Sequence, residues 1–324
     1  MPVSKERLAD DQAFALAHTG ADAVEDCIVV QELWSGYGQV LRLRLGGGEV
    51  RSVVLKSVMP PDDAEHPRGF GGPRSHARKL RSYDVEMAFY QRFSSRVPEA
   101  ARTAECLAAS RTERGWRFLF EDLDDAGFEG RRQRLTAREL DRCLDWLAAF
   151  HAGFVGTPVD GLWPVGTYWH LGTRPDEFEA MSPGPLRDAA AALDQALNRC
   201  RYPTLVHGDA KVANFCFGVT GVAAVDFQYT GGGCGMKDVA YFLSSCLSDA
   251  ECETRAPALL DAYFEKLRLA LPRDVDGGAL EAEWRRLYPA AWADFHRFLA
   301  GWAPTHWKIH SYTERMTELA LATL

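Results

Sequence analysis

The stretch that decides the fold is Val206-His-Gly-Asp-Ala-Lys-Val-Ala-Asn214, followed by Ala224-Val-Asp-Phe-Gln228. Apolar residues flank both segments, so Asp209, Asn214 and Asp226 are expected at the ends of short strands, which give a site a rigid base. Such a set matches the needs of phosphoryl transfer from ATP. One carboxylate orients a nucleophile or accepts its proton, while an amide oxygen and a second carboxylate hold Mg²⁺. The alternative is ordinary turn chemistry, in which these residue types are common.

The segments before this stretch favour the phosphoryl-transfer interpretation. A predicted third strand carries Val53-Val-Leu-Lys56, a predicted helix carries Glu86, and a strand ends at Phe120, in the order of the kinase series. The apolar run before Lys56 favours a lysine whose side chain is held in one position over a lysine that is exposed to water. Glu86 shares a helix face with Tyr83 and Tyr90, which favours an inward carboxylate over a surface one.

The spacing of apolar residues along the chain predicts an α+β, bilobal architecture. Period-two alternation and β-forming residues predict five antiparallel strands in a first lobe, at 27–34, 39–45, 50–58, 104–110 and 116–120. Helices are expected at 5–18 and about 78–95. After residue 121 the chain becomes mainly helical, with helices at 137–153, 186–200 and from 238 onward, and short strands at 204–207, 214–217 and 222–227. We therefore expect an N-terminal nucleotide-binding lobe over 1–121 and a catalytic, substrate-binding lobe over 122–324.

Composition narrows the possible partners. The 324 residues carry a formal charge of -8, which disfavours nucleic acid because phosphate contacts need a basic surface. No uncharged apolar run approaches the length of a membrane span, and the start of the chain lacks the apolar stretch of a signal peptide. The eight cysteines are expected to be reduced thiols, mostly buried. We expect a cytoplasmic protein that contacts no membrane; its oligomeric state stays open.

The combined motifs resemble the protein-kinase-like phosphotransferases that act on small molecules, the aminoglycoside phosphotransferase and choline kinase group. The resemblance is greatest to the ecdysteroid-kinase-like branch and covers roughly residues 30–250. Besides the two stretches quoted above, it rests on Lys237-Asp-Val-Ala-Tyr-Phe-Leu243, Phe120-Glu-Asp-Leu-Asp-Asp-Ala-Gly-Phe128 and Leu147-Ala-Ala-Phe-His-Ala152.

The resemblance implies a role for each residue type in the pattern. Asp209 would be the catalytic base, and Asn214 and Asp226 would be the Mg²⁺ ligands. Lys56 would contact the α- and β-phosphates of ATP, with Glu86 holding its ammonium in place.

Further positions are expected to assist. Lys211, two residues after the base, would neutralise charge on the transferred phosphoryl group, or else be a surface lysine. Gly36 and Gly38 in the first turn would let the backbone approach phosphates. Backbone groups of Glu121 and Leu123 in the connector would hydrogen-bond adenine.

Several departures from protein kinases limit the assignment. The metal-binding triplet reads Asp-Phe-Gln at 226–228, and nothing resembles a long activation loop, which disfavours protein substrates. The acceptor is expected to be a small-molecule alcohol, whether aminoglycoside, choline-like or steroid-like. The alternative is a non-catalytic, kinase-like nucleotide-binding or scaffold protein, although such a protein should have lost part of the Lys56, Asp209, Asn214 and Asp226 set.

Three other features have two interpretations each. His207 and His151 are expected to brace the structure by hydrogen bonds rather than to titrate in catalysis. The basic loop 66–81 is either solvated or a lid over phosphates or substrate. Four tryptophans of the C-terminal region either pack in the core or wall a substrate pocket: Trp284, Trp292, Trp302 and Trp307.

Overall fold

The computed structural model describes residues 5–61 and 72–324, and its contacts divide the chain into two units. The first unit comprises Met1–Ser94 and Thr103–Gly130, and the second comprises Ser95–Arg102 and Arg131–Leu324. A functional boundary at residue 121 stays a prediction. The first unit is built on a sheet and the second is mainly helical, which confirms the predicted α+β class.

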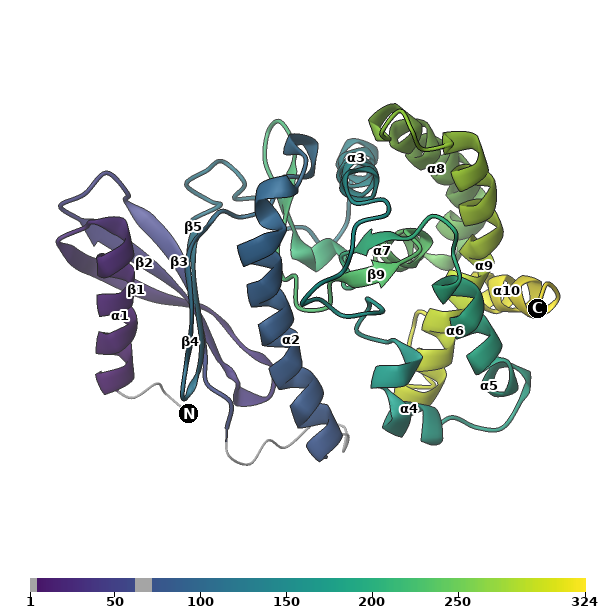
Figure 1. Ribbon diagram of the computed structural model, residues 1–324, viewed down its shortest axis with the longest axis horizontal. Helices are drawn as coiled ribbons and strands as arrows, with labels where there is room; N and C mark the ends of the chain where they lie inside the picture. The colour runs from purple at the N-terminus through teal and green to yellow at the C-terminus, as the bar shows by residue number, and fades with distance from the viewer. Residues whose placement is uncertain (1–4, 62–71) are drawn as a thin grey trace. The chain divides into compact units, whose positions relative to one another are not determined.

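The first unit contains the predicted five-stranded antiparallel sheet, in the order β1-β2-β3-β5-β4. Its strands are β1 Ala23–Glu32, β2 Gly38–Gly46, β3 Ser52–Val58, β4 Cys106–Thr112 and β5 Gly115–Glu121. Helices α1 (Lys5–Thr19) and α2 (Pro73–Arg92) flank the sheet (Figure 1).

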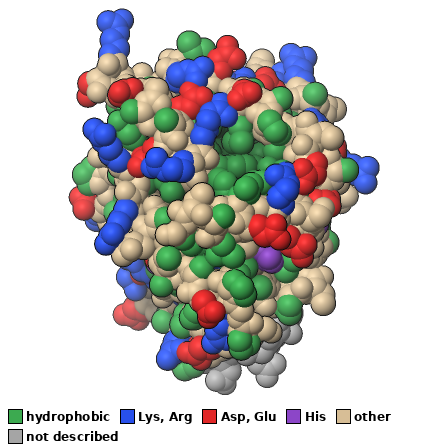
Figure 2. Space-filling model, turned by 90° about the vertical axis from the view of Figure 1, so that its right-hand side faces the viewer, with side chains coloured by type: hydrophobic (Ala, Val, Ile, Leu, Met, Phe, Trp, Pro, Cys, Tyr) green, Lys and Arg blue, Asp and Glu red, His purple; other side chains and the backbone are tan. Residues whose placement is uncertain are grey.

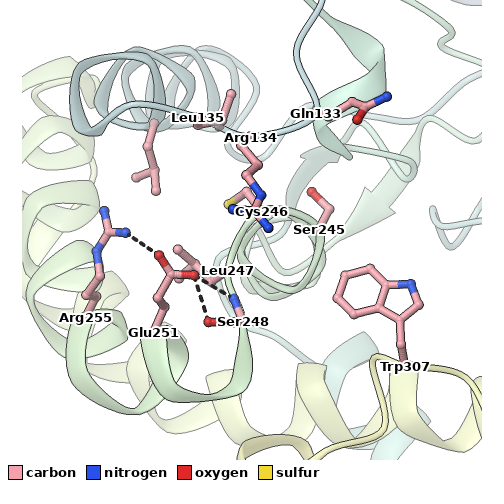
Figure 3. A pocket seen from close by; sticks show the side chains of 11 residues that line it. Gln133, Arg134, Leu135, Ser245, Cys246, Leu247, Ser248, Glu251, Arg255 and Trp307 are labelled. Atoms are coloured by element: carbon pink, nitrogen blue, oxygen red, sulfur yellow. Dashed lines mark hydrogen bonds and ion pairs between the residues drawn. The ribbon is translucent and has the colours of Figure 1, made fainter.

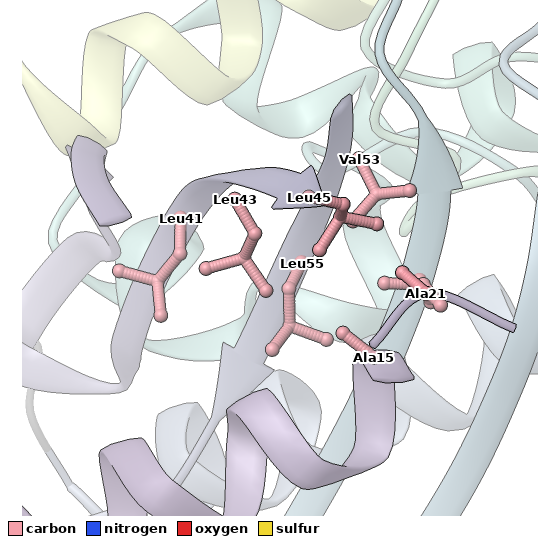
Figure 4. Close-up of a cluster of buried hydrophobic side chains, with 8 residues drawn as sticks. Ala15, Ala21, Leu41, Leu43, Leu45, Val53 and Leu55 are labelled. Carbon is pink, nitrogen blue, oxygen red and sulfur yellow. The ribbon is translucent and has the colours of Figure 1, made fainter. Parts of the chain in front are cut away.

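Alternation along β3 sends successive side chains to the two faces of the sheet. Leu55 joins a buried cluster with Leu43 of β2 and Ala15 of α1 (Figure 4). Lys56, the next residue, reaches Glu86 of α2 instead. The sheet therefore separates an apolar core under α1 from an ion pair under α2.

Helix α2 begins at Pro73, five residues before the predicted start, so the expected basic loop is wrong over its second half. Gly72 is the N-cap and Pro73 occupies the first turn, where a missing N–H costs no hydrogen bond. Proline next to glycines also predicts a loop, which is why the sequence alone does not place the helix start here. Residues of the expected loop that lie in the helix are Arg74, His76, Arg78, Lys79 and Arg81; Arg68 lies outside the described residues.

The second unit holds the remaining elements. Its helices are α3 Ala137–Gly153, α4 Pro175–Glu179, α5 Pro185–Asp188, α6 Ala190–Asn198, α7 Met236–Cys246, α8 Asp249–Ala270, α9 Gly277–Trp302 and α10 Ser311–Leu321. Its strands are β6 Thr204–Val206, β7 Phe215–Phe217, β8 Val222–Ala224 and β9 Gly231–Gly233. The predicted helix at 186–200 is thus two short helices.

Strand β9 was not predicted, because a run of three glycines has low strand propensity. It pairs with β6, and the glycines are explained by close packing. A Cβ on Gly231 would lie 2.3 Å from the carbonyl oxygen of Trp163.

Figure 2 shows how charged and apolar side chains are distributed over one face of the molecule. Acidic and basic side chains are interspersed there around apolar ones. Within residues 5–61 and 72–324, no helix combines the length and apolarity needed to cross a bilayer. All eight cysteines are free, and five of them are buried.

Replacing Leu43 by Ala should destabilise the first unit by about 2–5 kcal/mol, because Leu43 is buried in the cluster under α1. Urea unfolding should show this as a lower midpoint. Ile28→Ala is the control, since Ile28 is 49% exposed on β1 and should change the free energy of unfolding by less than about 0.5 kcal/mol. Equal shifts for the two variants would contradict the assigned core.

Acid should weaken the packing of α9 against α10 through His296. Its Nδ1 lies 2.9 Å from the Thr317 hydroxyl, and burial lowers the pKa of His296 from 6.5 to about 4. The unfolded chain therefore binds a proton at a higher pH than the folded chain, so stability should fall as pH drops from about 6.5 to about 4. His296→Gln should flatten that part of a melting-temperature profile; an unchanged slope would refute the assignment.

Candidate active site

The loop after β6 is held by a glycine conformation that other residues avoid. Gly208 has φ 81°, and a Cβ there would lie 2.1 Å from the carbonyl oxygen of Tyr229. Its own carbonyl accepts from the N–H of Tyr168 at 3.1 Å. The loop is therefore fastened on both sides just before Asp209.

Asp238, near the start of α7, anchors the same loop. Its buried carboxylate accepts the backbone N–H groups of His207 at 2.5 Å and Gly208 at 2.9 Å. His151 of α3 donates from Nε2 to this carboxylate at 3.2 Å and accepts at Nδ1 from the Tyr263 hydroxyl at 2.7 Å. These bonds give His151 a structural position. Asp238 lies in the motif 237–243, but the sequence predicts no role for it.

His207 links the two halves of the site. Its Nδ1 accepts from the N–H of Asp209 at 3.2 Å, and its Nε2 donates to the carbonyl of Val225 at 3.0 Å. Both ring nitrogens are thus used by the backbone, which agrees with the expected bracing role.

The carboxylate of Asp209 is held at one oxygen only. Oδ2 accepts from Nζ of Lys211 at 2.7 Å and from Nδ2 of Asn214 at 3.0 Å. Oδ1 is buried, and no described residue donates a well-formed hydrogen bond to it, although the Tyr241 hydroxyl lies close by. This leaves one oxygen for a group from outside the chain.

Asp226 lies beside Asn214 because β7 and β8 pair. The N–H of Val225 donates to the carbonyl of Asn214 at 3.0 Å, and Asp226 follows with φ 69°, a left-handed conformation that Asp tolerates. Burial tends to lower the pKa of Lys211, but the carboxylates of Asp209 and Asp226 outweigh this and raise it. Lys211 and Asn214 therefore contact Asp209, and Asp226 follows the residue bonded to Asn214 and acts on Lys211.

The donor set suits a hard cation completed by other oxygens. Asn214 directs its NH₂ to Asp209, so its amide oxygen has no hydrogen-bond donor among the described residues. In the part of the chain described here, no three His, Cys, Asp or Glu side chains are grouped as a metal site. An amide oxygen and one carboxylate fit Mg²⁺, which usually takes its other ligands from phosphates and water.

In the first unit, Lys56 and Glu86 form a buried ion pair. Nζ of Lys56 lies 2.8 Å from Oε1 and 2.7 Å from Oε2 of Glu86, and both side chains are less than a tenth exposed. Breaking such a pair leaves a buried charge without its partner, so the position of the lysine is tightly determined.

The two turn glycines differ in their surroundings. A Cβ on Gly38 would lie 2.1 Å from the carbonyl of Ser57, so packing against β3 already requires that glycine. Gly36, at φ 74° in a 3₁₀ turn (Trp34–Gly36), faces open space. Only Gly36 thus lacks a packing explanation.

The connector is held in place by the carboxylate of Asp122, which lies in the motif 120–128 and for which the sequence predicts no role. Asp122 is buried and forms an ion pair with Arg42, from whose Nη2 it accepts a hydrogen bond at 3.1 Å, and it accepts from the Ser52 hydroxyl at 2.5 Å. The carbonyl of Leu123 accepts from Phe128, while its N–H bonds to no described residue. The N–H of Glu121 is used by Glu105.

The four C-terminal tryptophans differ in burial, and a substrate pocket walled by them stays a prediction. Trp284 and Trp292 are fully buried in the helical core, and Trp302 packs against Phe298. Trp307 is 62% exposed and lines a pocket of about 500 Å³ in the second unit (Figure 3). Arg134, Glu251 and Arg255 give this pocket charged walls.

A comparison with family profiles decides the family. The profile described as the phosphotransferase enzyme family matches residues 29–289. The chain belongs to this family. This phosphotransferase matches no curated protein sequence. Its likeness to the ecdysteroid-kinase-like branch stays a prediction.

Solved structures show the same fold for this phosphotransferase. It is similar to amicoumacin kinase hAmiN in complex with AMP-PNP, Ca²⁺ and Ami, with TM-score 0.56, 14% identity and coverage of 98% of this chain and 92% of that one. It is also similar to choline kinase LicA from Streptococcus pneumoniae, with TM-score 0.51, 12% identity and coverage of 99% and 100%. A GDP complex of aminoglycoside 2'-phosphotransferase-IIIa gives TM-score 0.51, 12% identity and coverage of 99% of both chains.

Gly208→Ala should disrupt the site, because the left-handed conformation and the contact with Tyr229 both oppose a Cβ. We expect a loss of more than about 2 kcal/mol in the free energy of unfolding. Gly221→Ala is the matched control, since a Cβ there meets nothing within 4 Å. Thermal melting compares the two; similar melting temperatures would contradict this account of the loop.

Proposed function

We propose that the chain transfers the γ-phosphate of ATP to a hydroxyl of a small molecule, with Asp209 as the base. The proposal is carried by the asymmetric carboxylate of Asp209, in which Lys211 and Asn214 hold Oδ2 while Oδ1 stays buried without a well-formed hydrogen bond. A carboxylate fixed in this way is suited to orient an acceptor hydroxyl and take its proton. Membership of the phosphotransferase family supports the reaction class.

Asn214 and Asp226 are the proposed magnesium ligands. The bonds from Asn214 Nδ2 to Asp209 turn the amide oxygen away from that residue, and Asp226 follows the Val225–Asn214 backbone bond. When bound, Mg²⁺ would neutralise negative charge on the nucleotide phosphates. The two side chains would hold it without help from a third carboxylate.

Lys211 is proposed to stabilise the transferred group. Its ammonium is charged at neutral pH, since neighbouring carboxylates raise its pKa, and it sits 2.7 Å from Oδ2 of the base. A cation next to the reacting hydroxyl acts most strongly when negative charge builds up in the transition state.

Residues of the first unit are proposed to bind the nucleotide. Lys56, held by Glu86, would contact the α- and β-phosphates. Gly36 and Gly38 would bring backbone toward the phosphates, although Gly38 also has its packing role. The N–H of Leu123 and the backbone of Glu121 would hydrogen-bond adenine.

Asp209→Asn should lower turnover by about 10²–10⁴-fold, because the amide cannot accept a proton, while Mg²⁺-ATP should still raise the melting temperature. Asp226→Ala should abolish the magnesium-dependent part of that shift. Turnover is measured as ADP release with a panel of small alcohols, and nucleotide binding by thermal shift.

Asp145→Asn is the matched control, since Asp145 pairs with Lys266 on the outside of the helical unit and should leave both measurements unchanged. Wild-type turnover in Asp209→Asn would refute the base assignment. Nucleotide binding by the wild-type chain without phosphorylation of any alcohol would instead favour the non-catalytic nucleotide-binding protein.

A further inference from the structure

A lysine from the end of the chain reaches the surroundings of the proposed base. Lys308 lies in the turn between α9 and α10, where its N–H bonds to His306 at 3.2 Å and its carbonyl accepts from Thr313 at 2.8 Å. Its ammonium lies over the ring of Tyr241, whose hydroxyl lies close to Asp209, and the charges of Asp209 and Lys211 both act on it. The sequence around Lys308 predicts no role for it.

Aromatic rings surround the ammonium of Lys308. Nζ lies 4.6 Å from the ring centre of Tyr241, 5.4 Å from that of Phe295 and 5.6 Å from that of Trp307. Rings at these distances attract a cation through their negative faces. We call Tyr241, Phe295 and Trp307 the aromatic cage, and Lys308 already occupies it.

Although the ammonium of Lys308 is buried, it makes fewer hydrogen bonds than its three donors allow. Lys308 is 8% exposed, and among the described residues Nζ has one hydrogen-bond partner, the Ser244 hydroxyl at 3.3 Å. An ammonium has three donors. Burial lowers the pKa of Lys308 to about 8, as loss of water outweighs attraction to Asp209, whose Oδ2 is already paired with Lys211. An anionic ligand would supply the missing acceptor.

The neighbouring pocket extends this positive environment. Trp307 is shared between the aromatic cage and the pocket of Figure 3, and Ser245, another lining residue, accepts from the N–H of Val212 in the site loop at 3.1 Å. Arg134 lines the pocket and forms no ion pair with a described residue. Arg255 is the second basic lining residue and pairs with Glu251.

We propose that Lys308 selects an acceptor alcohol that carries a carboxylate or a similar acidic group near its hydroxyl. This inference rests on the proposed kinase function and names the substrate class of the same site. Lys308 would bind the acidic group while Asp209 takes the hydroxyl. An amino alcohol is disfavoured, because Lys308 fills the rings that would otherwise hold its ammonium, and because Lys211 and Lys308 both repel it.

The test compares two three-carbon primary alcohols that differ in charge, 3-hydroxypropanoate and 3-aminopropan-1-ol. Isothermal titration calorimetry on the full chain should show the hydroxy acid binding at least about tenfold more tightly, the size of one hydrogen bond to a charged group. Lys308→Met should remove the preference and Lys308→Arg should retain it. Lys266→Met is the matched control, because Lys266 pairs with Asp141 and Asp145 and should keep the wild-type ratio.

The outcomes separate this proposal from the kinase assignment. Equal or tighter binding of the amino alcohol by wild type, no measurable binding of the hydroxy acid, or a preference that survives in a folded Lys308→Met variant would each overturn the role of Lys308. The binding ratio is measured without nucleotide. A chain that shows the ratio but releases no ADP from ATP with either alcohol would refute the kinase function and leave the acid-binding site standing.

Discussion

The site depends on the buried carboxylate of Asp238. Two consecutive N–H groups, from His207 and Gly208, point into it, and they belong to a loop whose glycine has no room for a side chain. Unpaired buried amides and an unpaired buried carboxylate would each be costly, so the loop and the start of α7 are held in one arrangement. His151 and Tyr263 complete the same network from α3 and α8.

The bonds to Asp238 also limit how the carboxylate of Asp209, the proposed base, can be positioned. Because Asp238 fixes the backbone before Asp209 and His207 holds the N–H of Asp209 itself, the carboxylate can be positioned by only two further contacts, Lys211 and Asn214. One oxygen then stays available for an acceptor. The division between supporting and reacting groups is typical of sites that must hold their geometry before substrate binds.

The buried charges of each unit come from near and distant parts of the chain. Lys211 is two residues away, whereas Lys308 arrives from the turn before the last helix and lies on aromatic rings of α7 and α9. In the first unit, Lys56 and Glu86 are thirty residues apart and meet across the space between β3 and α2. Burial strengthens the interaction of each of these charges with its neighbours, because charges interact more strongly where water is excluded.

Local patterns in the sequence were sufficient for the five strands of the sheet, the fold class and the residues around Asp209, because period-two alternation and a strand-loop-strand motif act over a few residues. They were misleading at Pro73, where one residue type suits both a loop and a helix start, and at β9, whose glycines pair only because β6 lies beside them. Asp122, Asp238 and Lys308 carry no local signal of their roles. Their partners lie many residues away, and only packing of the folded chain removes the water that would otherwise make each of them an ordinary surface charge.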